Sequence, residues 1–327
     1  MQRYLRLMGM VGHILFLLVF SASAQEHVTK RIERIEAFDR DWVEDIVLLP
    51  MDKTPIEKYY SQKTGKSSSY IGRIVVSPVG DRIAFSVNND SIWVVRRDGT
   101  GLRCITQGLD NVHSPYWSID GKTITFIKGG NERNYAEGTI MQVTQDGAYK
   151  KIIGAYDLRE PGNRLFPPWM YSPDGKYLLR SSGKPLDYNR YVVRVKDQKV
   201  VAIYKTGGST LEELWFPNGK EVLIEGFLGH GESELVVFSL TGKYMTILPK
   251  GRMNLEPTIH PSGALIAYFD DYERELHFLT KDGSKNQLIL KTTPTVYIGD
   301  MNWTSQGDLA FDLRDQIYFL KLKKQVP

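Results

Sequence analysis

Three acidic residues recur along the chain at a constant spacing, since Glu212, Glu256 and Asp300 lie 44 residues apart. Carboxylates that converge from separate parts of a fold bind a hard cation such as Ca²⁺, or they recognise a basic group. The alternative is that each acid caps a nearby backbone N–H or pairs with a local base, for example Arg252 or Arg164. The elements that carry the three acids decide between these chemistries.

Each acid lies seven residues before the glycine of a recurring turn, of which the sequence Ser-Pro-Asp-Gly at 172–175 is the clearest copy. Proline fixes φ, aspartate bonds to its own backbone and glycine accepts a positive φ, which together specify a tight turn. The turn glycines are Gly80, Gly121, Gly175, Gly219, Gly263 and Gly307, at intervals of 41, 54, 44, 44 and 44 residues. The residues seven positions before them are Arg73, Ser114, Pro168, Glu212, Glu256 and Asp300. Repeats of roughly 40–45 residues are typical of four-stranded propeller blades.

Runs of β-branched and aromatic residues between these turns predict four strands in each repeat. Six such units over residues 70–327 predict an all-β, six-bladed β-propeller of four-stranded antiparallel blades. An open sandwich is the alternative, but a sandwich does not require a 44-residue self-similarity. In the propeller, the acids and Arg73 lie just ahead of the innermost strands, near the mouth of the central channel.

The sixth unit has only three predicted strands, so its exposed edge needs a partner. We expect the apolar segment Val43–Leu49 to supply the missing strand and close the ring. This segment belongs to an N-terminal arm, residues 25–69, in which residues 51–68 read as a polar connection.

The first 24 residues have the pattern of a secretory signal peptide. Arg3 and Arg6 precede the apolar stretch Val11–Phe20, and an A-x-A pattern predicts cleavage after Ala24. An uncleaved anchor is the alternative, although the apolar stretch is short for a bilayer. We therefore expect a periplasmic or secreted protein without a transmembrane segment after cleavage. Because Cys104 is the only cysteine, no internal disulfide can form, and a buried, inert thiol is expected.

The loops between the second and third strands of the blades are expected to open on the same face as the channel mouth. They carry Tyr135, Tyr188, Tyr272, Arg190 and Arg274. Tyrosine and arginine are enriched in binding surfaces, so these five residues are candidate binding residues. The alternative is that they belong to ordinary solvated loops.

The chain shows no sequence signature of catalysis that would identify an enzyme. The segment "GHGES" at 229–233 has glycine where a nucleophile elbow needs serine, and no two histidines have H-x-x-x-H spacing. The formal net charge of +4 and the lack of long basic runs argue against a nucleic-acid partner. The acids Glu212, Glu256 and Asp300 remain the candidate metal ligands.

The segment Pro115–Phe126, "PYWSIDGKTITF", resembles the WD40-like repeat of TolB-type six-bladed propellers. The segments "WMYSPDGKYLL" and "LWFPNGKEVLI" are further copies, and the resemblance covers roughly residues 70–323. It implies a propeller of the bacterial cell envelope that binds other proteins. The same repeats also form the propeller half of prolyl-oligopeptidase-type peptidases. Only about 45 residues separate the predicted cleavage site from the first blade, so we expect no separate N-terminal domain.

These observations favour an exported, monomeric and non-enzymatic binding module. Its expected partner is an envelope protein or peptide, with carbohydrate as a further candidate, and its expected site is the channel mouth. The alternative is a propeller enzyme, such as a polysaccharide lyase, a lactonase or a peptidase, with an acidic and metal-assisted site in the channel.

Overall fold

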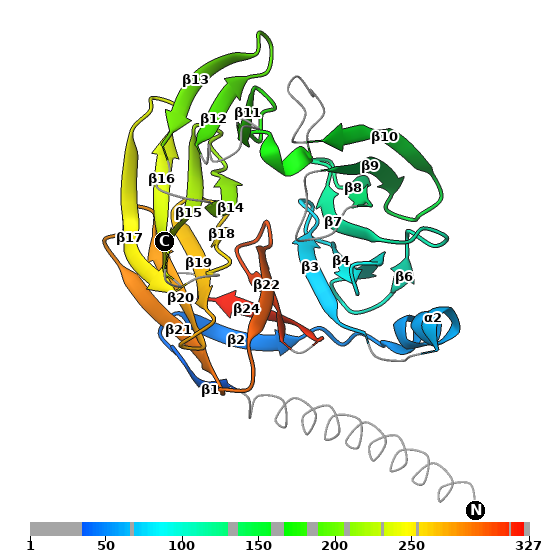
Figure 1. Cartoon of the computed structure of the whole chain (residues 1–327). Coiled ribbons are helices and arrows are strands. Elements are labelled where there is room, and N and C mark those ends of the chain that lie inside the picture. The colour runs from blue at the N-terminus through cyan, green and yellow to red at the C-terminus, as the bar shows by residue number, and fades with distance from the viewer. Residues whose placement is uncertain are drawn as a thin grey trace, which may run out of the picture.

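The computed structural model describes residues 35–65, 69–129, 137–157, 167–181, 189–205, 210–229, 232–252, 255–313 and 315–323. Within these residues the strands form six antiparallel sheets, which follow one another around a ring (Figure 1). The predicted all-β, six-bladed propeller is confirmed. The predicted signal peptide, residues 1–24, lies outside the described residues.

In the first three blades the chain runs from the innermost position outward. Blade one contains β3 (Ile71–Val76), β4 (Arg82–Val87), β5 (Ser91–Arg96) and β6 (Arg103–Cys104). Blade two contains β7 (Val112–Trp117), β8 (Thr123–Lys128), β9 (Glu137–Thr144) and β10 (Lys150–Asp157). Blade three contains the 3₁₀ helix η1 (Pro168–Met170), β11 (Tyr177–Ser181), β12 (Arg190–Arg194) and β13 (Lys199–Tyr204).

The last three blades repeat this order, and two of them receive an extra strand from the N-terminal arm. Blade four contains β14 (Thr210–Trp215), β15 (Glu221–Gly229), β16 (Glu232–Ser239) and β17 (Tyr244–Arg252). Blade five contains β18 (Thr258–Ile259), β19 (Leu265–Asp270), β20 (Glu275–Thr280), β21 (Asn286–Thr292) and β1 (Ile35–Phe38). Blade six contains β22 (Ile298–Trp303), β23 (Leu309–Leu313), β24 (Ile317–Leu322) and β2 (Val43–Leu48).

The recurring turn has the geometry that its sequence predicts. Gly175 has a φ of 70°, and its N–H donates to the carbonyl of Ser172 at 2.8 Å. The carboxylate of Asp174 accepts hydrogen bonds from the Ser172 hydroxyl and the Lys176 N–H. The other five turn glycines also have positive φ and donate to the residue three positions earlier. The most visible motif of the sequence is therefore part of the scaffold.

Strand β2 completes blade six, as predicted. It pairs antiparallel with β24, from Val43 opposite Leu322 to Leu48 opposite Tyr318. Strand β1 adds to the outer edge of blade five by pairing with β21. The N-terminal arm therefore covers the edges of two adjacent blades, which removes free strand edges where the ring closes.

The prediction that residues 51–68 form a polar connection is wrong for most of that stretch, because α2 (Thr54–Thr64) is helical. A proline stands in its first turn, where it costs no hydrogen bond, and Gly65 ends it in a left-handed conformation. Ile56 and Tyr60, four residues apart, are buried against blade one. Two buried residues in eleven give too weak a pattern for a sequence-based assignment.

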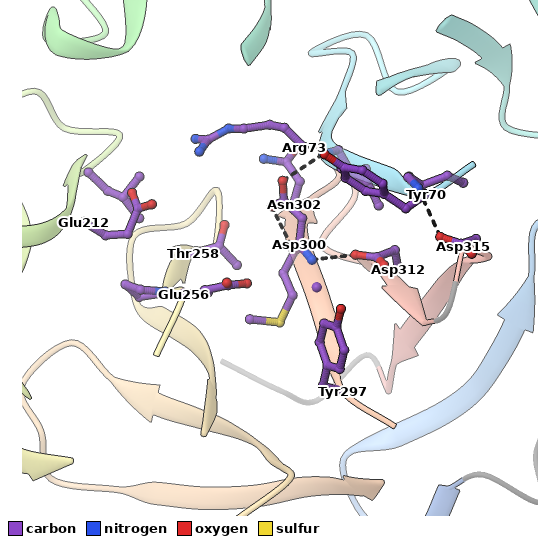
Figure 2. A pocket seen from close by; sticks show the side chains of 17 residues that line it. Tyr70, Arg73, Glu212, Glu256, Thr258, Tyr297, Asp300, Asn302, Asp312 and Asp315 are labelled. Atoms are coloured by element: carbon purple, nitrogen blue, oxygen red, sulfur yellow. Dashed lines mark hydrogen bonds between the residues drawn. The ribbon is translucent and has the colours of Figure 1, made fainter. Parts of the chain in front are cut away.

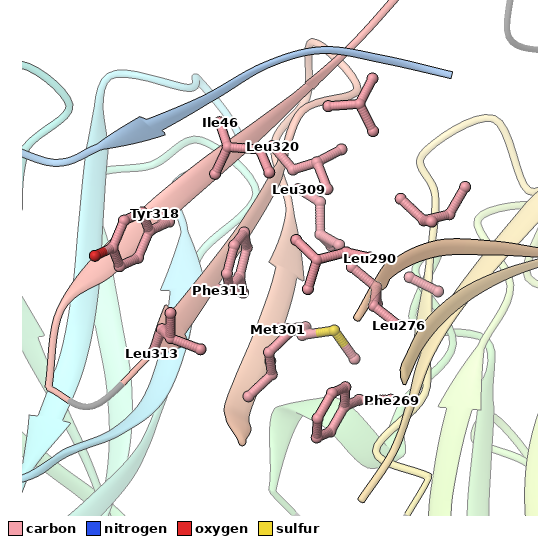
Figure 3. Close-up of a cluster of buried hydrophobic side chains, with 14 of the residues drawn as sticks. Ile46, Phe269, Leu276, Leu290, Met301, Leu309, Phe311, Leu313, Tyr318 and Leu320 are labelled. Carbon is pink, nitrogen blue, oxygen red and sulfur yellow. The ribbon is translucent and has the colours of Figure 1, made fainter. Parts of the chain in front are cut away.

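The largest part of the core lies where blades five and six meet the N-terminal arm (Figure 3). Phe269 and Leu290 of blade five pack with Phe311 and Leu320 of blade six, and Ile46 of β2 joins them. Each is at most 8% exposed. Burial of such side chains stabilises a fold by about 1.5–3 kcal/mol each, so this cluster fixes the ring closure.

Three tryptophans at equivalent repeat positions connect neighbouring blades. Each lies four residues before its turn glycine and donates its indole N–H to a backbone carbonyl of the preceding blade. The pairs are Trp117 with Val75, Trp215 with Met170 and Trp303 with Thr258. The innermost segments are thereby held in register around the channel.

Candidate functional site

The position seven residues before each turn glycine lies within the innermost strands in most blades, rather than just ahead of them as predicted. Arg73, Ser114, Glu212 and Asp300 fall inside β3, β7, β14 and β22. Strand pairing shifts register in or beside this position in all four blades. Such β-bulges bend a strand and redirect a side chain. Here the bulge recurs, so the fold provides the same redirected position in successive blades.

A cavity of about 710 Å³ lies between the innermost segments of blades four, five, six and one (Figure 2). The structure places four of the candidate residues on its wall: Arg73, Glu212, Glu256 and Asp300. Arg73 is the only basic residue among the described residues that line it. The sequence spacing thus brings these four residues to one cavity, although their role in binding remains a prediction.

On one side of the cavity, side-chain oxygens of four residues accept hydrogen bonds from backbone N–H groups. We call these residues, Asp300, Asn302, Asp312 and Asp315, the aspartate wall. The two Asp300 carboxylate oxygens accept the N–H groups of Ile74 at 2.9 Å and Met301 at 2.8 Å. Asp312 accepts the N–H of Asp300. The remaining bonds of this wall run from the Val76 N–H to Asn302 and from the Ile71 N–H to Asp315. For Asp300, the alternative reading as a backbone cap therefore describes its contacts.

Glu212 and Glu256, which we call the glutamate wall, face the cavity from blades four and five (Figure 2). Among the described residues, no side chain or backbone group forms a hydrogen bond or ion pair with the Glu256 carboxylate. Glu256 also has a φ of 43°, a left-handed conformation that costs a residue with a side chain about 1–2 kcal/mol. Strained backbone of this kind clusters at functional sites, so Glu256 is a candidate functional residue.

Charge and burial shift the pKa values of the carboxyl groups upward. The surrounding protein, and then the carboxylates of Asp300 and Glu212, raise the pKa of Glu256 to about 9. Burial also raises the pKa of Glu212, while the positive charge of Arg73 acts in the opposite direction. The ionised carboxylates of the cavity therefore repel one another, and Arg73 offsets only part of this repulsion. A positively charged ligand would stabilise their ionised form.

The pKa of the buried Asp312 carboxyl group, on the other side of the cavity, is raised as well. Burial, followed by the nearby charge of Asp300, raises its pKa to about 8. Its carboxyl group lies within 3.0 Å of the place where a Cβ on Gly299 would stand. Asp312 was not among the sequence candidates, and the only signal was an acid inside the apolar strand "LAFDL".

Three of the five predicted binding residues from the loops, Tyr272, Arg274 and Arg190, belong to the described part of the chain. Tyr135 and Tyr188 lie outside the described residues. Tyr272 is 69% exposed in a turn. Arg274 pairs with Asp271, and its guanidinium lies 5.7 Å from the ring centre of Tyr297, which lines the cavity.

Arg190 is not a loop residue but begins β12, where it pairs with Glu213 of blade four. Three residues that sequence reasoning missed, Tyr70, Tyr297 and Thr258, also line the main cavity. Tyr70 and Tyr297 each lie ten residues before their turn glycine, directly ahead of β3 and β22, so the repeat register could have marked both, whereas Thr258 begins β18.

The described residues contain no group of three or more acidic, histidine or cysteine side chains that could hold a metal ion. In the same part of the chain, no helix is long and apolar enough to cross a membrane. The Cys104 side chain is partly buried, and burial raises the pKa of its thiol, which disfavours the reactive thiolate.

Solved structures support the architecture. The Cps50 (Swd1) β-propeller domain of Myceliophteria thermophila superposes with a TM-score of 0.58 and 12% sequence identity. The match covers 78% of this chain and 97% of that domain. At this identity the likeness concerns the fold alone.

Among curated proteins, Dipeptidyl-peptidase 5 from Porphyromonas endodontalis is 31% identical over 121 residues. The match covers 33% of this chain and 16% of the peptidase, so it reaches only a small part of that protein. No family model matches the chain. Together the comparisons support the β-propeller fold and assign the chain to no narrower family.

Proposed function

We propose that this chain is an exported, monomeric and non-enzymatic propeller of the cell envelope that binds a basic group of a protein or peptide in its channel cavity. The observation that carries the proposal is the glutamate wall: two carboxylates face one cavity whose only lining base, among the described residues, is Arg73. An ammonium or guanidinium group entering the cavity gains charge-assisted hydrogen bonds from these carboxylates.

The test compares two blocked peptides, acetyl-Gly-Lys-Gly-amide and acetyl-Gly-Gln-Gly-amide, by isothermal titration calorimetry. We expect the lysine peptide to bind at least about 10-fold more tightly, because hydrogen bonds to charged groups contribute about 1.5–3 kcal/mol. The variant Glu212→Gln/Glu256→Gln should lose that preference and keep its melting temperature. Equal binding of both peptides, or an unchanged preference in the variant, would show that the glutamate wall is not the site.

Calcium is the rival occupant of the same carboxylates. The sequence predicts Glu212, Glu256 and Asp300 as its ligands, but two Asp300 contacts to the backbone leave fewer lone pairs for a cation. If calcium is the ligand, millimolar Ca²⁺ should raise the melting temperature and compete with the lysine peptide. If a basic group is the ligand, Ca²⁺ should leave both quantities unchanged.

A peptidase-related role is the second candidate, and the partial likeness to Dipeptidyl-peptidase 5 favours it. In that case the cavity would receive a peptide for cleavage rather than for stable binding. Incubating the protein with the two peptides and analysing the products by mass spectrometry distinguishes the roles. Cleavage that disappears in the Glu212→Gln/Glu256→Gln variant would support the peptidase role, and intact peptides support the binding role.

A further inference from the structure

A second cavity of about 220 Å³ lies beside the acidic one, between blades three and four. It is lined by the apolar side chains of Trp169, Met170, Leu179 and Leu214. The two cavities share three lining residues, Arg73, Glu212 and Leu214, so they adjoin at the glutamate wall.

Two of the four charged residues that line this second cavity, Arg190 and Glu213, are paired with each other, and the other two, Arg73 and Glu212, lie where it adjoins the main cavity. Arg190 of blade three donates to the Glu213 carboxylate and to the Thr210 hydroxyl, and Thr210 also bonds to Glu213. A ligand group therefore meets an ion pair that is satisfied within the protein, together with apolar side chains. Such a lining favours an apolar group over a charged one, because a second charge would have to compete with the existing pair.

The size of the second cavity also limits its occupant. Pockets that hold a whole small ligand measure about 300–1,000 Å³, so 220 Å³ suits a single side chain. Successive side chains of an extended peptide point to opposite sides of its backbone. Two cavities that lie on either side of Glu212 and Leu214 can therefore receive neighbouring residues of one chain.

We propose that the two cavities together recognise a peptide segment in which a basic residue adjoins an apolar one. The basic side chain is held at Glu212 and Glu256, and the apolar side chain fills the space between Trp169, Met170 and Leu179. This inference rests on the proposed function of the glutamate wall and adds a specificity subsite to it.

The test uses acetyl-Leu-Lys-Leu-amide, acetyl-Gly-Lys-Gly-amide and acetyl-Leu-Gln-Leu-amide with the full protein. Leucine on both sides of lysine makes the comparison independent of peptide direction. We expect the Leu-Lys-Leu peptide to bind at least about 10-fold more tightly than the Gly-Lys-Gly peptide, since small apolar differences in a pocket give 10–200-fold discrimination. The Leu-Gln-Leu peptide should bind more weakly than Leu-Lys-Leu.

Two matched variants test whether the preference for leucine arises in the second cavity. Met170→Trp fills it and should reduce the preference for leucine to about 2-fold or less, while Met170→Leu keeps an apolar wall and should retain the preference. Because Met170 bonds to Trp215 through its backbone carbonyl, neither change removes that contact. Melting temperatures check that both variants fold, and Leu179→Phe fills the same space if Met170→Trp does not.

The outcomes separate the two proposals. Equal affinity for the Leu-Lys-Leu and Gly-Lys-Gly peptides, with both dependent on Glu212 and Glu256, would overturn the apolar subsite and leave the proposed function intact. If the Glu212→Gln/Glu256→Gln variant binds the lysine peptides as tightly as the wild type, the proposed function is overturned and this inference with it. Equal affinity for spermidine and the Leu-Lys-Leu peptide would also overturn the peptide assignment.

Discussion

Asp300 of the aspartate wall and Glu256 of the glutamate wall carry the same functional group at equivalent repeat positions, yet they use it differently. Asp300 gives its oxygens to backbone N–H groups and so joins blade six to blade one. Glu256 faces the cavity, and no described residue pairs with its carboxylate. The comparison shows that a repeat position fixes where a side chain lies, while its length and neighbours decide what it binds.

The largest expected difference between the two walls is in stability. Asp300→Ala leaves the Ile74 and Met301 N–H groups without their acceptor, and each unsatisfied buried group costs about 1–3 kcal/mol. We expect the free energy of unfolding, measured by urea denaturation, to fall by about 2–4 kcal/mol. The control Glu256→Ala removes no acceptor from a buried N–H group, so it should not lower the free energy of unfolding. Equal losses in both variants would remove the distinction between the walls.

A smaller effect is expected from two glycines, Gly299 on the wall of the main cavity and Gly226 in β15 of blade four. A Cβ at Gly299 would lie 2.5 Å from Oδ1 of Asp312, so Gly299→Ala must displace that buried carboxyl group. Overpacking of this kind costs about 1–3 kcal/mol. At Gly226 of blade four, a Cβ would meet Glu234 at an ordinary 3.5 Å, so Gly226→Ala should be close to neutral. Thermal unfolding of the two variants makes the comparison, and a tolerated Gly299→Ala would argue against a rigid aspartate wall.

A further expected effect is a dependence of stability on pH. The pKa of Glu256 is raised to about 9 and that of Asp312 to about 8, so the folded state binds more protons than the unfolded chain between about pH 5 and 9. Stability should therefore fall as the pH rises through this window. The acids Glu212, Asp300, Asp271 and Asp315 add to the repulsion, and Arg73 opposes it at Glu212.

Melting temperatures at pH 5.5, 7 and 9 would show this decline. Glu256→Gln removes one of the titrating groups, so its decline should be shallower than that of the wild type. A melting temperature that increases from pH 5.5 to pH 9 would contradict the assigned pKa shifts.

The features that recur from blade to blade could be predicted from the sequence, whereas several features that occur only once could not. The 44-residue spacing located the blades and brought Arg73, Glu212, Glu256 and Asp300 to one cavity. The ring-closing strand followed from an incomplete last blade. By contrast, α2 buries only two apolar residues, and Asp312 lies at a repeat position that carries no acid in the other blades.

The roles of the individual acids could not be predicted from the sequence either. Spacing placed Asp300 and Glu256 at equivalent positions, but it could not show that Asp300 bonds to Ile74 across the blade interface. That contact depends on the local bulge in β22 and on the side-chain conformation. Predicting it requires the three-dimensional register of two adjacent blades.

The central claim is that the glutamate wall binds a positively charged group. Titration of acetyl-Gly-Lys-Gly-amide at pH 7, in two buffers of different ionisation enthalpy, tests it most directly. Because the pKa of Glu256 is raised to about 9, its carboxyl group is protonated at pH 7 and must ionise as lysine enters. The account predicts that binding releases protons and that Glu212→Gln/Glu256→Gln abolishes both the release and the preference for lysine. Binding without proton release, and with the same affinity in the variant, would contradict it.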